Sequence, residues 1–284
     1  MADPANRPGQ WWYSSEEGAP VPVGIDPAVP SPARMYDYYL GGKDNYAADR
    51  EAAGEALSAV PHGRQIARAN RNFLCRAVVL MAGHGIGQFI DLGTGIPTSP
   101  NVHELARRVQ PDARVLYVDN DAVVTAYNRA LLAKDDGVKA MNGDIRNPHG
   151  ILASPECKEL IDLHQPVGVL CVAVLHFIPD ADDPNGIVKA FKQAMAPGSF
   201  LALSHITSDG TSPNVIAAVE ETYARASAPA VFRTRDEIQR FFDGLDMEPP
   251  GLADVTGWHS CPGAFPAQPP ALAFLGGVGH KARR

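Results

Sequence analysis

From residue 85 to residue 207, short apolar segments alternate with amphipathic segments, and this alternation constrains the fold more than any other feature. The apolar segments have the length of strands and are separated by segments of helical length; they lie at 88–92, 113–119, 138–144, 167–175 and 199–206. Strands that alternate with helices typically form a parallel sheet with helices on both faces. The sequence therefore predicts a doubly wound α/β fold.

The last third of the chain departs from this alternation. Two further apolar segments, 251–258 and 271–278, are separated by a proline-rich loop rather than by a helix. Strands that are joined without a crossover helix pair antiparallel, which predicts an antiparallel hairpin at the edge of the sheet. The complete prediction is a seven-stranded, mostly parallel sheet in a Rossmann-like core that spans residues 85–284.

The residues before this core are predicted to form a helical cover at 33–84. A short helix is expected from Pro32 to the stop at Gly41, and apolar residues recur with the helical period across 63–83. Proline removes backbone donors and disfavours helix before it. Because seven prolines lie in the first 32 residues, residues 1–32 are interpreted as an irregular leader outside the structural domain 33–284.

Composition excludes several classes of function. The chain of 284 residues carries 25 Lys and Arg against 32 Asp and Glu, a formal charge of -7, so it offers no basic field to nucleic acid or to anionic lipid. Its four cysteines show no CxxC spacing, which argues against a zinc cluster. No apolar run reaches the roughly 20 residues of a membrane helix, and the start does not resemble a signal peptide. We expect a cytoplasmic protein without a metal.

Polar residues gather where the predicted strands end. The first strand contains Asp91 and runs into Gly93 and Gly95, the second ends at Asp119, and the third runs into Asp144. Ligands bind beyond the carboxyl ends of parallel strands, near the point where the winding direction reverses. Glycine lets the backbone approach a ligand closely, and an acidic residue at the second strand end suits ribose hydroxyls. The pattern predicts a nucleoside-binding site.

Two nucleoside cofactors fit these residues, NAD and S-adenosylmethionine. The dinucleotide fingerprint GxGxxG is incomplete, because Thr98 stands at its third glycine. Pro97 and Pro100, with Pro100 as the first helical residue, set the next helix back from the glycines, whereas a pyrophosphate needs the helix amides close by. Asp91 and Asp144 would repel phosphates but would attract a sulfonium and an amino group. The charge pattern favours S-adenosylmethionine.

Longer segments resemble the class I, Rossmann-like S-adenosylmethionine-dependent methyltransferases. The similarity is strongest to an actinobacterial S-adenosyl methyltransferase family that was formerly described as a domain of unknown function. It covers roughly residues 25–280, and the similar segments are SPARMYDYYLGGKDNYAADR, RANRNFL, QFIDLGTGIPTSPNVHELA, VLYVDND and GDIRNP. The resemblance implies an enzyme, a methyltransferase, with S-adenosylmethionine as its cofactor.

The resemblance also implies roles for the residues of the first strand end. Gly93 and Gly95 would line the adenosine and methionine parts of the cofactor. Asp91 would lie beneath the methionine amino group. Pro97 stands where the wider superfamily often has a third glycine, so the shape of this loop is expected to differ from that of other members.

The next two strand ends receive roles on the same resemblance. Asp119 would hold the ribose hydroxyls, with Asn120 beside it. Asp144 would accept a hydrogen bond from the adenine amino group, and Ile145 would cover the adenine ring. Together with the first strand end, these residues make up the implied cofactor site.

The amino-terminal helix and the fourth strand end supply candidates for the acceptor side. We expect Tyr39, Gly41 and Asn45 to close over the cofactor while Tyr36 faces the acceptor; alternatively, the aromatic residues only pack the helix on the sheet. His176, just past the fourth strand, is a candidate general base because the ordinary pKa of histidine lies near neutrality. The alternative is a histidine that is simply packed at a strand end.

Methyl transfer to a small-molecule acceptor is the function that the sequence favours, since the chain has no basic tract for nucleic acid. Two other functions stay open. One is a non-catalytic protein that binds S-adenosylmethionine or S-adenosylhomocysteine, because the binding motifs would be identical. The other is an NAD-dependent oxidoreductase. The sequence indicates neither the acceptor atom nor the oligomeric state.

Overall fold

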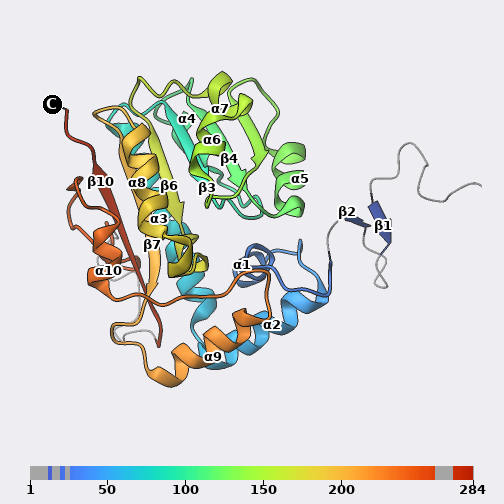
Figure 1. Cartoon of the computed structure of the whole chain (residues 1–284). Coiled ribbons are helices and arrows are strands. Elements are labelled where there is room, and N and C mark those ends of the chain that lie inside the picture. The colour runs from blue at the N-terminus through green and yellow to red at the C-terminus, as the bar shows by residue number, and fades with distance from the viewer. Residues whose placement is uncertain (1–11, 15–19, 23–25, 260–270, 284) are drawn as a thin grey trace, which may run out of the picture.

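A mixed β-sheet forms the centre of the computed structural model, which describes residues 12–14, 20–22, 26–259 and 271–283. Five parallel strands lie side by side in the order β5-β4-β3-β6-β7 (Figure 1). In chain order they are β3 (Gln88–Leu92), β4 (Arg114–Asp119), β5 (Val138–Asn142), β6 (Gly168–Val172) and β7 (Phe200–Thr207). The predicted doubly wound α/β fold is confirmed.

Antiparallel strands complete the sheet on the β7 side. β10 (Ala273–His280) pairs antiparallel with β7 and with β8 (Asp246–Met247), so the path through the sheet has seven strands. β9 (Ala253–Asp254) pairs with β10 off this path as an eighth strand. The predicted antiparallel edge is confirmed, but segment 251–258 contributes only two residues to it. Residues 260–270 of the intervening loop lie outside the described residues.

Successive side chains of each strand point to opposite faces of the sheet, so a hydrophobic core forms on each face. In β4, Val115 and Tyr117 pack with α3 and α4, whereas Leu116 and Val118 pack on the opposite face with α6, α7 and α8. The bounds of these helices and of α5 and α10 are α3 (Gly63–Gly83), α4 (Val102–Arg107), α5 (Ala122–Leu131), α6 (Pro148–Ala153), α7 (Pro155–Leu160), α8 (Pro184–Ala194) and α10 (Arg235–Arg240). Burial on both faces explains the nearly continuous apolar character of the parallel strands.

β6 is shorter than predicted: a strand was expected over 167–175, and β6 ends at Val172. Ala173 has a φ of 56°, a left-handed conformation that ends the extended chain. Its N–H donates to Ser204 Oγ at 3.0 Å, and the 3₁₀ helix η1 (Leu175–Phe177) follows. The chain therefore turns away from the sheet directly after β6.

Three helices form a cover, which Figure 1 shows below the sheet: the consecutive helices α1 (Pro32–Leu40) and α2 (Ala47–Ala59), and α9 (Pro213–Ala224) from much later in the chain. They share a core that includes Met35, Ala53, Val219 and Tyr223 with Ile66 of α3. The predicted amino-terminal helices are confirmed; the contribution of α9 is an addition. In the leader, β1 (Trp12–Ser14) and β2 (Pro20–Pro22) pair antiparallel. No helix of the described residues is both long and apolar enough to cross a bilayer.

Candidate functional site

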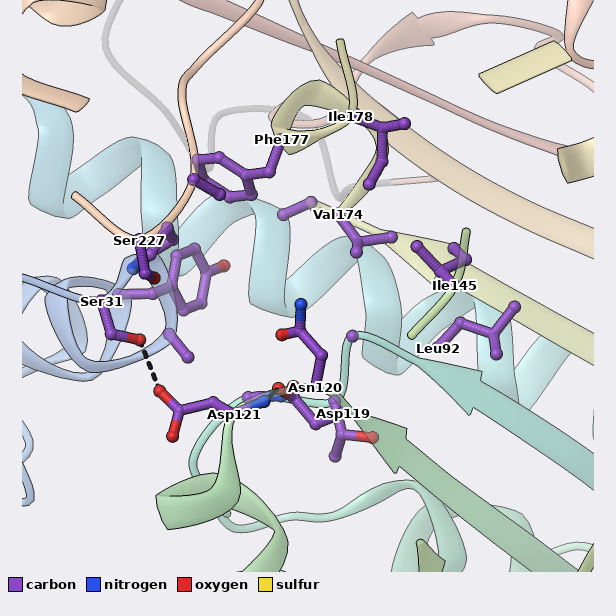
Figure 2. A pocket seen from close by; sticks show the side chains of 18 of the residues that line it. Ser31, Leu92, Asp119, Asn120, Asp121, Ile145, Val174, Phe177, Ile178 and Ser227 are labelled. Atoms are coloured by element: carbon purple, nitrogen blue, oxygen red, sulfur yellow. Dashed lines mark hydrogen bonds between the residues drawn. The ribbon is translucent and has the colours of Figure 1, made fainter. Parts of the chain in front are cut away.

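A cavity of about 610 Å³ lies at the carboxyl ends of β3, β4 and β6, beneath the amino end of α1 (Figure 2). β3 lies between β4 and β6, so the winding direction reverses here, and ligands of open α/β sheets bind at such a point. The volume falls in the range of roughly 300–1,000 Å³ that small ligands occupy. The cavity brings together most of the predicted cofactor residues, namely Asp91, Gly93, Gly95, Asp119, Asn120 and Ile145.

The turn after β3 depends on glycine. Gly93 and Gly95 have φ values of 70° and 69°, which residues other than glycine rarely adopt. A Cβ on Gly93 would lie 2.4 Å from Val174 Cγ2, whereas a Cβ on Gly95 would meet no atom within 4 Å. The space over Gly95 therefore belongs to the cavity, while Gly93 is needed for packing.

This difference predicts unequal costs for two matched substitutions. Gly95→Ala should lower the free energy of unfolding by about 1–2 kcal/mol, the cost of a left-handed alanine. Gly93→Ala should cost more, because the same strain adds to a clash with Val174. Urea denaturation of both variants without ligand measures the difference. Equal losses in the free energy of unfolding would show that the Val174 side chain moves aside without an energetic cost.

Asp119 holds two turns together at the end of β4. Its Oδ2 accepts a hydrogen bond from the Gly95 N–H and its Oδ1 accepts one from the Asp121 N–H, both at 2.9 Å. The residue is 6% exposed, and burial raises the pKa of its carboxyl to about 6. Each oxygen keeps a second lone pair for a ligand. The carboxylate is thus fixed in place at the wall of the cavity.

Asp91 is a buried carboxylate without a partner. It is 5% exposed and lines the cavity, and its two carboxylate oxygens accept no hydrogen bond from any described residue. Burial raises its pKa to about 7, an effect that Asp119 increases and the nearby Arg71 opposes. A buried carboxylate is costly unless it is paired, so this position suits a ligand that brings a positive charge. S-adenosylmethionine, with its sulfonium and amino groups, fits this donor set.

At the third strand end, the structure separates two residues that were predicted to act together. Ile145 lines the cavity, as does Arg146, but Asp144 is not part of the wall. Arg146 holds the Asp144 carboxylate, with Nη2 at 2.6 Å from Oδ2, and this hydrogen bonding lowers the pKa of Asp144. Asp144 thus lies outside the wall of the cavity, with its carboxylate held by Arg146, and its contact with adenine stays a prediction.

Of the four residues of the cover that were expected at the cavity, only Tyr36 lines it. Tyr39 forms a hydroxyl pair with Tyr223 at 3.2 Å, Asn45 donates to Asp37 Oδ2 at 2.8 Å, and Gly41 ends α1 with a φ of 92°. None of the three predicted residues lines the cavity, because the amino end of α1 reaches it and the carboxyl end does not. The residues of the cover that do line it are Ser31, Pro32, Ala33, Arg34 and Tyr36.

Hydrogen bonds fasten this end of α1 to the end of β4. Ser31 Oγ donates to Asp121 Oδ2 at 2.7 Å, which Figure 2 shows as a dashed line. Arg34 Nη1 lies 3.3 Å from the same oxygen, and Arg34 Nε donates to Asp49 Oδ2 of α2 at 2.7 Å. Ser31, the residue before α1, thus bonds across the cavity rather than capping its helix.

Tyr36 faces the cavity with its ring, and its hydroxyl is held at two points. It donates to the Ala67 carbonyl oxygen and accepts from Asn70 Nδ2, both at 2.9 Å. Burial raises the pKa of Tyr36 to about 12, so the phenol stays protonated at neutral pH. Asn70 was missed, although an asparagine between Ile66 and Phe73 on the apolar stripe of α3 is a readable signal.

His176 lies in η1 and lines a second, smaller cavity, not the large one. It is 4% exposed, and its Nδ1 has no hydrogen-bond partner among the described residues. Burial lowers its pKa well below the ordinary value, helped by His205 and Arg233, so the ring is neutral at neutral pH. The expected position beside the methyl donor is therefore not observed, because η1 turns the imidazole toward the cover.

The segment between the glycine turn and α4 differs from the prediction. α4 begins at Val102 with Asn101 as N-cap, and Glu104 completes a capping box; Pro100 is therefore not the first helical residue. The Arg71 guanidinium donates to the carbonyl oxygens of Thr98 and Pro100 and holds this segment. The helix amides that a pyrophosphate needs are thus set back further than expected.

The aspartates after β6 serve structural contacts. Asp183 caps α8 by accepting from the Gly186 N–H at 2.9 Å, and Asp180 pairs with Arg233 at 2.6 Å. Among the residues that the structure describes, no three His, Cys, Asp or Glu side chains form a group that could hold a metal ion.

The strand order, the glycine turn and the acidic residue that ends β4 define a class of protein, the Rossmann-like S-adenosylmethionine-dependent methyltransferases. The chain belongs to the S-adenosyl methyltransferase family, whose sequence model matches residues 19–282. The protein is therefore a methyltransferase that uses S-adenosylmethionine.

Two solved structures are similar over nearly the whole chain. A candidate methyltransferase from Thermobifida fusca is 36% identical with a TM-score of 0.86, over 92% of this chain and 98% of its own. A DUF574 family protein from Streptomyces avermitilis is 38% identical with a TM-score of 0.85, over 90% of this chain and 99% of its own. No curated protein matches the chain.

Proposed function

We propose that this methyltransferase acts on a small-molecule acceptor that is enclosed between the sheet and the helical cover. The observation that carries the proposal is that hydrogen bonds hold the cover in place: Ser31 and Arg34 both bind Asp121 at the cavity. A macromolecular acceptor would need an open approach to the donor, whereas a compact acceptor fits beneath α1. The formal charge of -7 also disfavours a nucleic-acid acceptor.

In this proposal the strand ends hold S-adenosylmethionine. Asp119 accepts from the ribose hydroxyls through its free lone pairs, with Asn120 beside it. The unpartnered carboxylate of Asp91 binds the positive methionine end, over the backbone of Gly93 and Gly95. Ile145 covers the adenine ring.

The chain contributes chiefly positioning to the reaction. S-adenosylmethionine supplies an activated methyl group: its S–CH₃ bond breaks with the electron pair left on sulfur, while an acceptor lone pair forms the new bond to carbon and the acceptor proton passes to water. Aligning the two reactants contributes much of such a rate enhancement. Tyr36, fixed by Asn70 and the Ala67 carbonyl, forms a rigid wall on the acceptor side.

Calorimetry with S-adenosylmethionine and NAD, followed by incubation with methyl-labelled donor and a small-molecule library, tests the function. We expect binding of S-adenosylmethionine, no binding of NAD, and label in a small product. Binding without transfer to any acceptor class would favour a non-catalytic binding protein, and binding of NAD alone would favour an oxidoreductase.

Affinity for S-adenosylmethionine should fall as the pH falls. The cation favours the ionised form of Asp91, whose pKa is raised to about 7, so protonation below that value competes with binding. The ionised fraction of Asp91 alone corresponds to roughly 25-fold weaker binding at pH 5.5 than at pH 7.5, which calorimetry measures. Asp91→Asn should reduce this dependence, leaving the smaller contribution of Asp119. An unchanged pH profile in that variant would contradict the role of Asp91.

A further inference from the structure

Arg71 of α3 brings a guanidinium to the wall of the large cavity. Its Nη2 donates to the carbonyl oxygens of Thr98 and Pro100, so the segment that follows the glycine turn holds the guanidinium in place. Its Nε is buried without a hydrogen-bond partner, and its Nη1 donates to no described residue. A guanidinium carries N–H donors on all three of its nitrogens. Arg71 therefore keeps donors that the described part of the chain does not use.

Asp91 is an anion in the same wall, and its carboxylate has no charged partner among the described residues. Arg71 lies near enough to lower the pKa of the Asp91 carboxyl, yet the two side chains form no ion pair with each other. Opposite charges in a partly buried site attract each other strongly, so another contact must hold them apart. For Arg71 that contact is the pair of carbonyl groups at Thr98 and Pro100. The wall thus presents a cation and an anion that are close but unpaired.

A zwitterion is the ligand that satisfies both of these charges. A cation alone would pair with Asp91 and leave the guanidinium of Arg71 without a countercharge, and an anion alone would do the reverse; either ligand would leave one charge desolvated without compensation. An α-amino acid carries its ammonium and its carboxylate on one carbon, so it offers both charges at a short, fixed separation. The methionine end of S-adenosylmethionine is such a group, and arginine is enriched where proteins recognise carboxylates.

We propose that Arg71 binds the carboxylate of the methionine part of S-adenosylmethionine, while Asp91 binds the amino group on the same carbon. The contact is assigned to Nη1 of Arg71, because Nε is buried. The inference rests on the proposed function, since it takes Asp91 as the partner of the methionine amino group. Because the same guanidinium holds Thr98 and Pro100, the bound carboxylate is also linked to the segment that leads to α4.

The test compares two ligands by calorimetry: S-adenosylmethionine and decarboxylated S-adenosylmethionine, which keeps the sulfonium and the amino group but lacks the carboxylate. We expect the wild-type protein to bind the decarboxylated ligand about 10–100-fold more weakly, the factor for one hydrogen bond to a charged group. Equal affinities would overturn the role of Arg71 and leave the proposed function intact. Wild-type protein that binds neither ligand would instead refute the proposed function.

Arg71→Gln should remove this preference, so that the two ligands bind within about three-fold of each other. The affinity for S-adenosylmethionine should fall, whereas the affinity for the decarboxylated ligand, which has no group for Arg71 to bind, should not. If Arg71 served only to anchor Thr98 and Pro100, its substitution would weaken the binding of both ligands alike. An undiminished preference in Arg71→Gln would therefore overturn the proposal.

Arg68→Gln is the matched control. Arg68 lies about one turn earlier on α3, is exposed and does not line the large cavity, so this variant should keep the wild-type preference. Arg71→Lys decides the question where Arg71→Gln fails to fold. Its single nitrogen cannot serve the two carbonyl groups and the carboxylate as a guanidinium does, so its preference should be smaller than that of wild type. The full wild-type preference in Arg71→Lys would also overturn the proposal.

Discussion

Replacing Asp119 with alanine should weaken the binding of S-adenosylmethionine about 100-fold. Hydrogen bonds to a charged group contribute about 1.5–3 kcal/mol each, and the loss of two ribose contacts corresponds to at least that factor. The substitution also removes the acceptor of the Gly95 and Asp121 N–H groups, so the turn beside the cofactor loses its anchor. Calorimetry of the folded variant measures the effect.

Two further variants distinguish the loss of the ribose contacts from damage to the fold. Asp119→Asn keeps the size of the side chain but removes its charge and one acceptor, and should bind with intermediate affinity. Asp112→Ala lies before the amino end of β4, where the side chain is exposed, and should bind as wild type does. Wild-type affinity in Asp119→Ala would place the ribose elsewhere.

The helices and strands were predicted correctly where the periodicity of their own residues indicates the element. The alternating strands and helices, the long α3 helix and the antiparallel edge all agree with the periodicity of their own residues. The glycine turn and Asp119 were also predictable, because glycines directly after a strand permit the tight left-handed turn that other residues rarely adopt. These residues are brought together by topology alone, since parallel strands end at one edge of the sheet.

Contacts between distant segments were not readable. Nothing near Ser31 indicates that its hydroxyl binds Asp121, 90 residues further on. The placement of His176 depends on the left-handed Ala173, a conformation that propensity does not predict for alanine. The ion pair between Asp144 and Arg146, two residues away, was not predicted either. Contacts with distant residues therefore place Ser31 and Ala173, whereas the partner of Asp144 is local.

Replacing Arg34 with alanine should lower the free energy of unfolding by about 3–5 kcal/mol, the range for breaking a buried ion pair from one side. The side chains of Arg34 and Asp49 are 4% and 0% exposed. Asp49 also accepts from the N–H groups of Ser31 and Tyr46 at 2.8 Å, so its charge would stay buried without a countercharge. Urea denaturation measures the loss, and weaker binding of S-adenosylmethionine should accompany it because α1 is released from Asp121.

The matched control is the pair between Arg225 of the α9 end and Glu55 of α2, which is exposed on both sides. Arg225→Ala should leave stability nearly unchanged, since exposed ion pairs contribute little. Because Arg34 and Asp49 act as a unit, the double variant Arg34→Ala/Asp49→Ala should cost less than the sum of the two single variants. Additive costs would show that the two residues stabilise the cover independently, and that the ion pair does not join α1 to α2.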